Sequence, residues 1–168
     1  SGKPFVLYVS SFDTRKNHRL LLDVWDRLLA THPPGRVPHL VLVGKNGWGS
    51  KAWNDNEVLD AMSRHPGLSA SITVLDCVSD ATLNHLYRSC LFTVYPSLYE
   101  GWGLPVAESL GHGKFCLSSN GGSLKEVAPG FVDYLDPKDF TGWCTAVMGY
   151  AGHPERLRAR EQNLKSFR

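Results

Sequence analysis

The sequence predicts an α/β fold in which one doubly wound, parallel sheet of about six strands is covered by helices on both faces. Short runs of β-branched and aromatic residues alternate with longer stretches of helical periodicity, an order typical of repeated β-α units. Several strand-like runs are continuously apolar over four to six residues, which is typical of strands buried on both faces of a parallel sheet. The length of 168 residues fits a single domain, residues 1–168, with a sizeable core.

These patterns predict the individual strands and helices. Strands are expected at residues 5–10, 40–43, 72–75, 92–95, 115–118 and 132–135. Helices are expected at residues 18–31, 57–64, 81–89, 104–111, 124–127, 140–150 and 154–167. The first helix is amphipathic, because apolar residues recur along it at helical spacing. The longest irregular stretch, residues 44–56, is rich in Gly and Trp and is a candidate lid or docking surface.

The composition narrows the kinds of partner. With 18 basic and 16 acidic residues the net charge is +2, which does not indicate nucleic acid, so any bound anion must be held by a local site. No apolar run approaches the about 20 residues that cross a bilayer. The cysteines lack C-x-x-C or metal-ligand spacing, and we expect reduced thiols in a cytosolic protein. They are Cys77, Cys90, Cys116 and Cys144.

The first candidate site residues follow the first predicted strand. In sheets of this kind ligands bind beyond the carboxyl ends of the strands. Ser10 ends the strand, Ser11 follows it directly, and Arg15, Lys16 and Asn17 precede a helix. A cation at a strand-to-helix turn, near the positive end of the helix dipole, is a natural partner for phosphate. Solvated Arg and Lys side chains, with the Asn capping the helix, remain an alternative on these residues alone.

The segment after the fourth predicted strand concentrates glycines and acids. Residues 96–108 run Pro-Ser-Leu-Tyr-Glu-Gly-Trp-Gly-Leu-Pro-Val-Ala-Glu. The glycines let a ligand approach the backbone, Pro105 suits the first turn of a helix, and the free amides there would face a pyrophosphate. Glu100 lies before this helix and Glu108 one turn into it, so one cleft can present both. Because a carboxylate repels phosphate, both acids suit sugar hydroxyls, which leaves phosphate to Lys16 and the amides.

Two simpler interpretations bear on these turns. A Gly-Pro turn with two exposed acids would explain the helix start near residue 104, but not the concentration of Gly, Trp and Glu around it. After the fifth predicted strand, Asn120-Gly121-Gly122-Ser123 precedes a short helix. This segment is either another turn that faces a ligand or an ordinary tight turn, and the residues alone leave both open.

The succession of motifs resembles the retaining glycosyltransferases with two Rossmann-like domains (the GT-B architecture), in particular the large group 1 family that builds bacterial O-antigens and capsules. Glu100 and Glu108 match its E-x7-E motif, residues 99–105 are its most recognisable core, and residues 15–17 look like its R-K-N/G phosphate motif. The resemblance covers roughly residues 5–165. Further segments in the family's order and spacing are residues 40–44, 79–87 and 126–127.

The resemblance implies a role for each candidate residue. Lys16 would pair with the donor diphosphate, Glu100 would contact hydroxyls of the transferred sugar, and Glu108 would bind the ribose. These roles make Glu100 and Lys16 the catalytic candidates. The donor-binding candidates are Ser10, Ser11, Arg15, Lys16, Cys77, Val78, Glu100, Gly101, Trp102, Gly103, Leu104 and Glu108.

Within that set, several residues would act through their backbone. Residues 101–104 would hold sugar and phosphate in this way, and Cys77 and Val78 would meet the base. The chain departs from the family at one position. Many relatives carry Gly-Arg where this chain has Ser-Ser at residues 10–11, so one phosphate-binding Arg is absent. Neutralisation would then depend on Lys16, helped by Arg15.

The resemblance further implies a nucleotide-sugar-binding domain that serves transfer of a hexose, with retention, to a growing bacterial surface polysaccharide or glycolipid. GDP-mannose is the first candidate donor, and no metal or other cofactor is expected, because Lys16 and the helix amides would stabilise the leaving diphosphate. The family's acceptor site lies in an N-terminal domain that this chain lacks, so we expect the domain alone to bind donor without turnover. The expected location is the cytoplasm, where peripheral contact with the inner face of the membrane gives access to a glycan or lipid-linked acceptor.

Two other functions are compatible with parts of the sequence. A glycoside hydrolase would use Glu100 and Glu108 as an acid and nucleophile pair, but it would leave Lys16 without a task. A non-catalytic regulatory or scaffold domain could bind a nucleotide-sugar without turnover. An upstream second Rossmann-like domain with an acceptor-facing His or Asp would favour the transferase.

Overall fold

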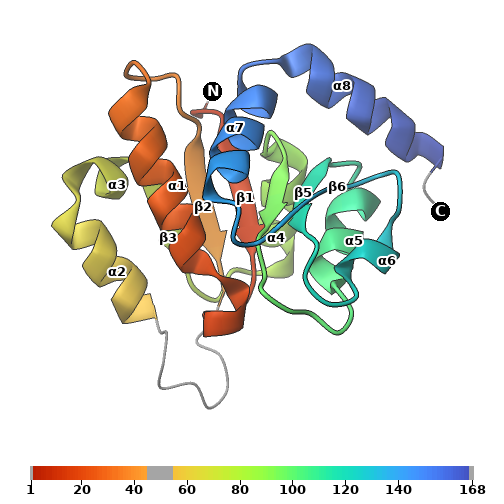
Figure 1. Ribbon diagram of the computed structural model, residues 1–168, viewed down its shortest axis with the longest axis horizontal. Coiled ribbons are helices and arrows are strands. Elements are labelled where there is room, and N and C mark those ends of the chain that lie inside the picture. The colour runs from red at the N-terminus through yellow and green to blue at the C-terminus, as the bar shows by residue number, and fades with distance from the viewer. Residues whose placement is uncertain (1, 45–54, 167–168) are drawn as a thin grey trace.

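The computed structural model describes residues 2–44 and 55–166, and it confirms the predicted α/β fold with an all-parallel sheet (Figure 1). Six strands are hydrogen-bonded in the order β3-β2-β1-β4-β5-β6. They are β1 (Phe5–Val9), β2 (His39–Val43), β3 (Ile72–Leu75), β4 (Thr93–Tyr95), β5 (Cys116–Ser119) and β6 (Asp133–Leu135). All six match strands predicted from the sequence to within one residue at each end. Residues 45–54 of the candidate lid lie outside the described residues.

The helices also follow the prediction closely. They are α1 (His18–Thr31), α2 (Asp55–Arg64), α3 (Pro66–Ser71), α4 (Asp80–Ser89), α5 (Leu104–Gly111), α6 (Leu124–Val127), α7 (Phe140–Ala151) and α8 (Pro154–Asn163), with 3-10 turns η1 (Thr14–Lys16) and η2 (Leu164–Ser166). Among the described residues only α3 and η1 are additions, and residues 164–166 of the predicted last helix form the 3-10 turn η2. In α3, Pro66 occupies the first turn and Leu68 is buried. Its composition, rich in Gly and Ser, gives little helical signal, so tertiary packing determines this helix.

The two faces of the sheet pack against different helices, because side chains alternate along each strand. Val6 and Tyr8 join a large apolar cluster with residues of α1 and α7. Leu7 and Val41 point to the other face, where they pack with Tyr87 of α4. Figure 1 shows α1 and α7 in front of the sheet and α4 behind it. The sheet is therefore buried on both faces, as its apolar runs predict.

The order in which strands are added reverses at β1, which pairs with β2 on one side and with β4 on the other. The chain moves outward from β1 to β2 and β3, then returns to the far side of β1 and continues to β6. At such a switch point the loops that leave the two central strands run to opposite faces, which opens a crevice at the carboxyl edge. The loops after β1 and β4 leave the sheet at this switch point.

Hydrogen bonds hold these two loops together. The Leu98 amide donates to the Arg15 carbonyl at 2.8 Å. The Asn17 side chain donates to the carbonyls of Pro96 at 3.1 Å and Pro137 at 3.2 Å. Asn17 precedes α1 in the left-handed conformation, with φ of 57°, and its side chain makes no capping bond to the helix. Asn17 therefore occupies the N-cap position that the alternative interpretation gave it, but its side-chain amide joins three loops at the carboxyl edge and does not bond to the helix.

A Gly-Gly turn supports the loop after β4 from the other side. A Cβ atom added to Gly121 would overlap the carbonyl oxygen of Leu98 and would lie 2.9 Å from that of Ser97. Gly122 has a positive φ of 63° and lies against the backbone of Glu100. This turn therefore serves close packing of two loops, which favours the tight-turn interpretation.

Replacing Gly121 with Ala should lower the free energy of unfolding by about 1–3 kcal/mol, because the added methyl group meets a rigid backbone carbonyl. Gly111 is the matched control, since a Cβ added there meets nothing within 4 Å. Gly111→Ala lies at the end of a helix and should be neutral or slightly stabilising. Urea unfolding measures both, and equal effects of the two changes would contradict the packing role of Gly121.

His18 opens α1 and belongs to the core rather than the surface. Its side chain stacks on Phe12 with ring centroids 4.6 Å apart and packs beside Tyr8 at 4.9 Å. Its Nε2 atom lies 3.2 Å from the Ser10 hydroxyl. Burial, reinforced by the charge of Lys16, lowers the pKa of His18 from 6.5 to about 3. The folded protein thus keeps this imidazole neutral at pH values where an unfolded chain protonates it.

The depressed pKa of His18 predicts a loss of stability in mild acid. Between pH 6.5 and about 3 the unfolded chain binds a proton that the folded protein does not, so stability falls as the pH falls through this window. The slope from this group approaches about 1.4 kcal/mol per pH unit. His18→Gln should remove that part of the slope in urea unfolding at pH 7, 6 and 5. The carboxylates contribute to both proteins, and identical slopes would refute the assignment.

Candidate functional site

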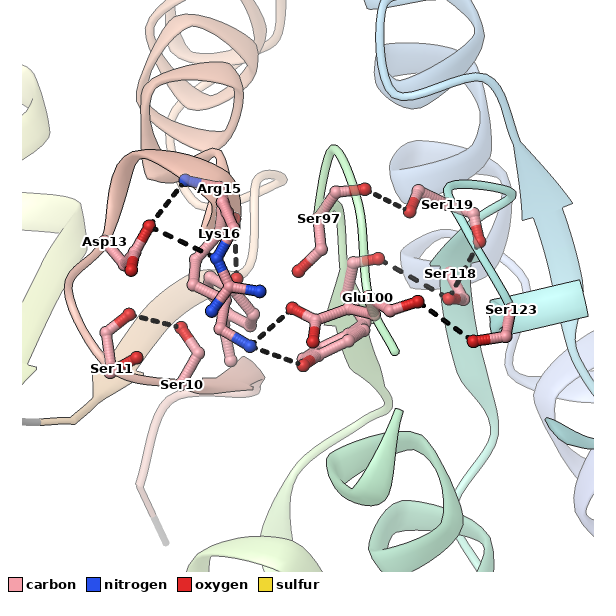
Figure 2. A network of polar contacts seen from close by, with 12 residues as sticks. Ser10, Ser11, Asp13, Arg15, Lys16, Ser97, Glu100, Ser118, Ser119 and Ser123 are labelled. Carbon is pink, nitrogen blue, oxygen red and sulfur yellow. Dashed lines mark hydrogen bonds and ion pairs between the residues drawn. The ribbon is translucent and has the colours of Figure 1, made fainter. Parts of the chain in front are cut away.

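A buried ion pair lies at the switch point of the sheet (Figure 2). Lys16 ends the 3-10 turn that follows β1, and Glu100 lies in the loop that follows β4. The Lys16 ammonium contacts the Oε1 atom of Glu100. The two residues are only 9% and 7% exposed. The structure therefore brings together the two residues that were predicted to be catalytic.

Two tyrosines hold this pair from the core. Lys16 Nζ donates to the Tyr95 hydroxyl at 3.1 Å, and the Tyr8 hydroxyl donates to the Lys16 carbonyl at 2.6 Å. Burial raises the pKa of both phenols, and the negative charge of Glu100 adds to the effect. Both hydroxyls therefore stay protonated at neutral pH. The sequence reasoning missed these tyrosines because they lie within predicted strands, where an aromatic residue indicates only core packing.

The burial of Lys16 bears on the alternative that both cations of its turn are solvated. A solvated Lys side chain is excluded, because this ammonium is enclosed and ion-paired. Arg15 is the solvated member, with 53% of its side chain exposed, and it pairs with Asp13 at 3.6 Å. The lysine ammonium has three protons. Two of them are directed to Glu100 and Tyr95.

Ser10 and Ser11 begin the loop that follows β1. Ser10 is buried, and its hydroxyl lies 3.2 Å from both the Ser11 carbonyl and the His18 ring. The Ser10 carbonyl abuts Gly44, where an added Cβ would overlap it. Ser10 is thus closely packed, while Ser11 is partly exposed.

The loop between β4 and α5 presents its glycines and apolar side chains at the same edge. Gly103 caps α5 with a positive φ of 65°, and a Cβ added there would approach Leu124 to 2.6 Å. Pro105 occupies the first turn of α5, as predicted. Trp102 and Leu104 are 79% and 63% exposed. The positive end of the α5 dipole is therefore directed toward this loop.

The loop also depends on Ser123, which the sequence placed in the Gly-Gly turn but not among the candidate site residues. Its hydroxyl donates to the Glu100 carbonyl at 2.9 Å and lies 2.6 Å from that of Gly101, and its amide donates to the Glu100 carbonyl at 3.1 Å. These bonds fix the backbone that carries the Glu100 carboxylate. The residue lies 23 positions away in the chain, so only the fold reveals the contact.

Glu108 lies in different surroundings from Glu100. It is exposed on α5, and its Oε2 atom accepts a hydrogen bond from the Tyr87 hydroxyl at 3.1 Å. Glu100, by contrast, is buried against a cation. The two acids of the E-x7-E motif thus have different partners: Glu100 pairs with Lys16, and Glu108 accepts from Tyr87.

Cys77 and Val78 follow β3 at the carboxyl edge. Cys77 is an exposed, free thiol in the left-handed conformation, with φ of 50°, and Val78 packs partly against the second apolar cluster. A left-handed residue that is not Gly or Asn is uncommon and costs conformational energy. All four cysteines are free, as predicted.

The remaining features are a cavity away from the ion pair and, among the described residues, the absence of a membrane-spanning helix and of a metal-ligand cluster. A cavity of about 420 Å³ lies at the opposite, amino-terminal edge of the sheet, where Pro4, Pro38 and His39 line it. None of the candidate site residues line it. Within residues 2–44 and 55–166 no helix is long and apolar enough to cross a bilayer. The same residues contain no group of three or more His, Cys, Asp or Glu side chains that could hold a metal ion.

Comparison with known proteins identifies relatives among mannosyltransferases. The chain is 35% identical over 135 residues to the O-antigen chain mannosyltransferase B of Escherichia coli, covering 80% of this chain and 33% of that protein. It is 29% identical over 90 residues to the O-antigen chain mannosyltransferase RfbU of Salmonella typhimurium, covering 54% of this chain and 26% of that protein. The chain therefore spans about a third or less of the length of these relatives.

Solved structures share the fold at lower identity. Anabaena HepE in complex with UDP-glucose has a TM-score of 0.82 and 18% identity, over 98% of this chain and 43% of HepE. The catalytic domain of the Helicobacter pylori cholesterol-α-glucosyltransferase has a TM-score of 0.74 and 15% identity, over 98% of this chain and 97% of that one. The family model described as "Glycosyl transferases group 1" matches residues 1–144. The chain therefore belongs to the group 1 glycosyltransferase family.

Proposed function

We propose that this protein binds a nucleotide-sugar at the carboxyl edge of its sheet and transfers the sugar, with retention, to a bacterial surface polysaccharide or glycolipid. The observation that carries the proposal is the Lys16–Glu100 ion pair at the switch point, between the loops after β1 and β4. Mannose is the first candidate sugar, because relatives at 29–35% identity are O-antigen mannosyltransferases. A calorimetric screen of GDP-, UDP- and dTDP-sugars tests the donor directly.

Lys16 would hold the diphosphate. Negative charge builds on this leaving group in the transition state, and a fixed ammonium stabilises that charge without having to reorganise. Glu100 and Tyr95 fix the Lys16 side chain before the donor arrives. The positive end of the α5 dipole adds to the same field. With Ser10 and Ser11 in place of an Arg, Arg15 would supply the second, weaker cation.

Glu100 would have two tasks. It is the counter-ion of Lys16, and it would accept hydrogen bonds from hydroxyls of the transferred sugar. Glu108 would bind the ribose, and the backbone of residues 101–104 would hold sugar and phosphate. The backbone of Cys77 and Val78 would meet the base.

The remaining parts of the proposal concern the whole protein. The acceptor, a glycan or a lipid-linked glycan, would be bound by an additional Rossmann-like domain of the full-length enzyme. The reaction would need no metal, since Lys16 and the amides of α5 neutralise the diphosphate. It would take place in the cytoplasm, with peripheral contact to the inner face of the membrane.

Lys16→Ala should weaken the binding of GDP about ten- to a hundredfold, since a charge-assisted contact to phosphate is worth about 1.5–3 kcal/mol. Arg15→Ala is the matched control. Because its side chain is solvated, the loss there should be at most about threefold. Isothermal titration calorimetry in the absence of divalent metal measures both, and circular dichroism verifies the fold of each variant. Equal affinities of Lys16→Ala and the unmodified protein would refute the phosphate assignment.

The two carboxylates should separate in their effects. Glu108→Gln should weaken GDP and GDP-mannose alike, about tenfold, because both ligands contain the ribose. Glu100→Gln should weaken GDP-mannose, because it removes a contact with the sugar hydroxyls. It should not weaken GDP, which lacks the sugar, and the loss of a negative charge does not disfavour the diphosphate. In the full-length enzyme it should lower kcat more than it raises KM, as expected for a contact that strengthens in the transition state. Equal losses of GDP affinity in both variants would disprove this division.

A further inference from the structure

Tyr87 connects the core of the domain to an exposed acid. The residue lies on α4 and is only 2% exposed. Its hydroxyl donates to the Oε2 atom of Glu108, on α5, at 3.1 Å. This bond joins a fixed ring to a carboxylate that is otherwise exposed to solvent.

The ring of Tyr87 is held on two sides. It belongs to the apolar cluster on the α4 face of the sheet, together with Leu7 and Val41. It also stacks on His112, with ring centroids 4.7 Å apart and an interplanar angle of 12°. His112 is the C-cap of α5, four residues after Glu108 on the same helix. The hydroxyl is thus positioned by the sheet and by the helix that carries its acceptor.

This arrangement orders the Glu108 side chain. An exposed glutamate samples several rotamers, and fixing it costs up to about 2 kcal/mol of conformational entropy. Burial, and then the negative charge of Glu108, raise the pKa of the Tyr87 phenol, so the hydroxyl remains a donor at neutral pH. Tyr87 occupies one acceptor position on Oε2, so Oε1 and the second position on Oε2 remain for a ligand among the described residues.

We propose that Tyr87 is a positioning residue, which orients Glu108 so that its carboxylate accepts hydrogen bonds from the two ribose hydroxyls of the donor. The inference rests on the proposed function, because it takes Glu108 to be the ribose ligand. It makes Tyr87 a determinant of nucleotide affinity rather than of the chemical step. The ribose is then recognised by a carboxylate that is ordered before the ligand arrives.

The test compares GDP with 2′,3′-dideoxy-GDP by calorimetry in the unmodified protein and in Tyr87→Phe. The Phe ring keeps the stacking and the core packing, so the change removes only the hydroxyl. We expect about a three- to tenfold loss of GDP affinity, and no loss for the dideoxy nucleotide. In a Glu108→Ala background the same change should cause no further loss, because the two residues act as one unit. If GDP does not bind, UDP and its dideoxy analogue replace it.

Tyr150→Phe is the matched control. Tyr150 is also a buried tyrosine whose hydroxyl donates to a carboxylate, that of Asp133, at the start of β6 and away from the carboxyl edge. Its loss should lower the unfolding temperature without changing either affinity.

The outcomes separate the inference from the function on which it rests. An unchanged GDP affinity in Tyr87→Phe, or equal losses for GDP and its dideoxy analogue, would overturn the positioning role. An unchanged GDP affinity in Glu108→Ala, or no binding of GDP and UDP to the unmodified protein, would overturn the proposed function itself.

Discussion

The buried ion pair between Lys16 and Glu100 is the interaction on which the carboxyl edge depends. An ammonium and a carboxylate that leave water lose hydration worth several kcal/mol each, so each must find the other in good geometry. The backbone bond from Leu98 to Arg15 and the two amide bonds of Asn17 hold the loops at the distance that the pair requires. Either loop without the other would leave an uncompensated charge, which explains why the two loops are joined so closely.

The surroundings of the two acids also argue against a glycoside hydrolase. Such an enzyme places an acid and a nucleophile on either side of the scissile bond, so that each faces the substrate. Here Glu100 faces the Lys16 ammonium and Glu108 faces the Tyr87 hydroxyl. The glycoside hydrolase interpretation also leaves the buried Lys16 without a task. Family membership agrees with this conclusion.

The sequence predicted the strands and most helices because burial on both faces produces continuous apolar runs that are visible in one dimension. It missed α3, whose Gly and Ser residues carry little helical preference. The sequence placed Lys16 and Glu100 in one site but assigned them separate tasks. Their contact joins residues 84 positions apart and exists because β4 lies beside β1. Strand order is a property of the whole chain, so no local pattern could have predicted the pair.

Tyrosine is the common means by which this domain fixes its polar groups. Tyr8 from β1 holds the Lys16 carbonyl, Tyr95 from β4 holds the Lys16 ammonium, and Tyr87 from α4 holds Glu108. Each ring is at most 2% exposed, so its position is determined by core packing. The hydroxyl of each ring therefore holds the group that it contacts in a fixed position. The entropic cost of ordering these charged side chains is therefore met during folding. The geometry of these polar groups therefore depends on buried tyrosines, which a sequence pattern assigns to core packing alone.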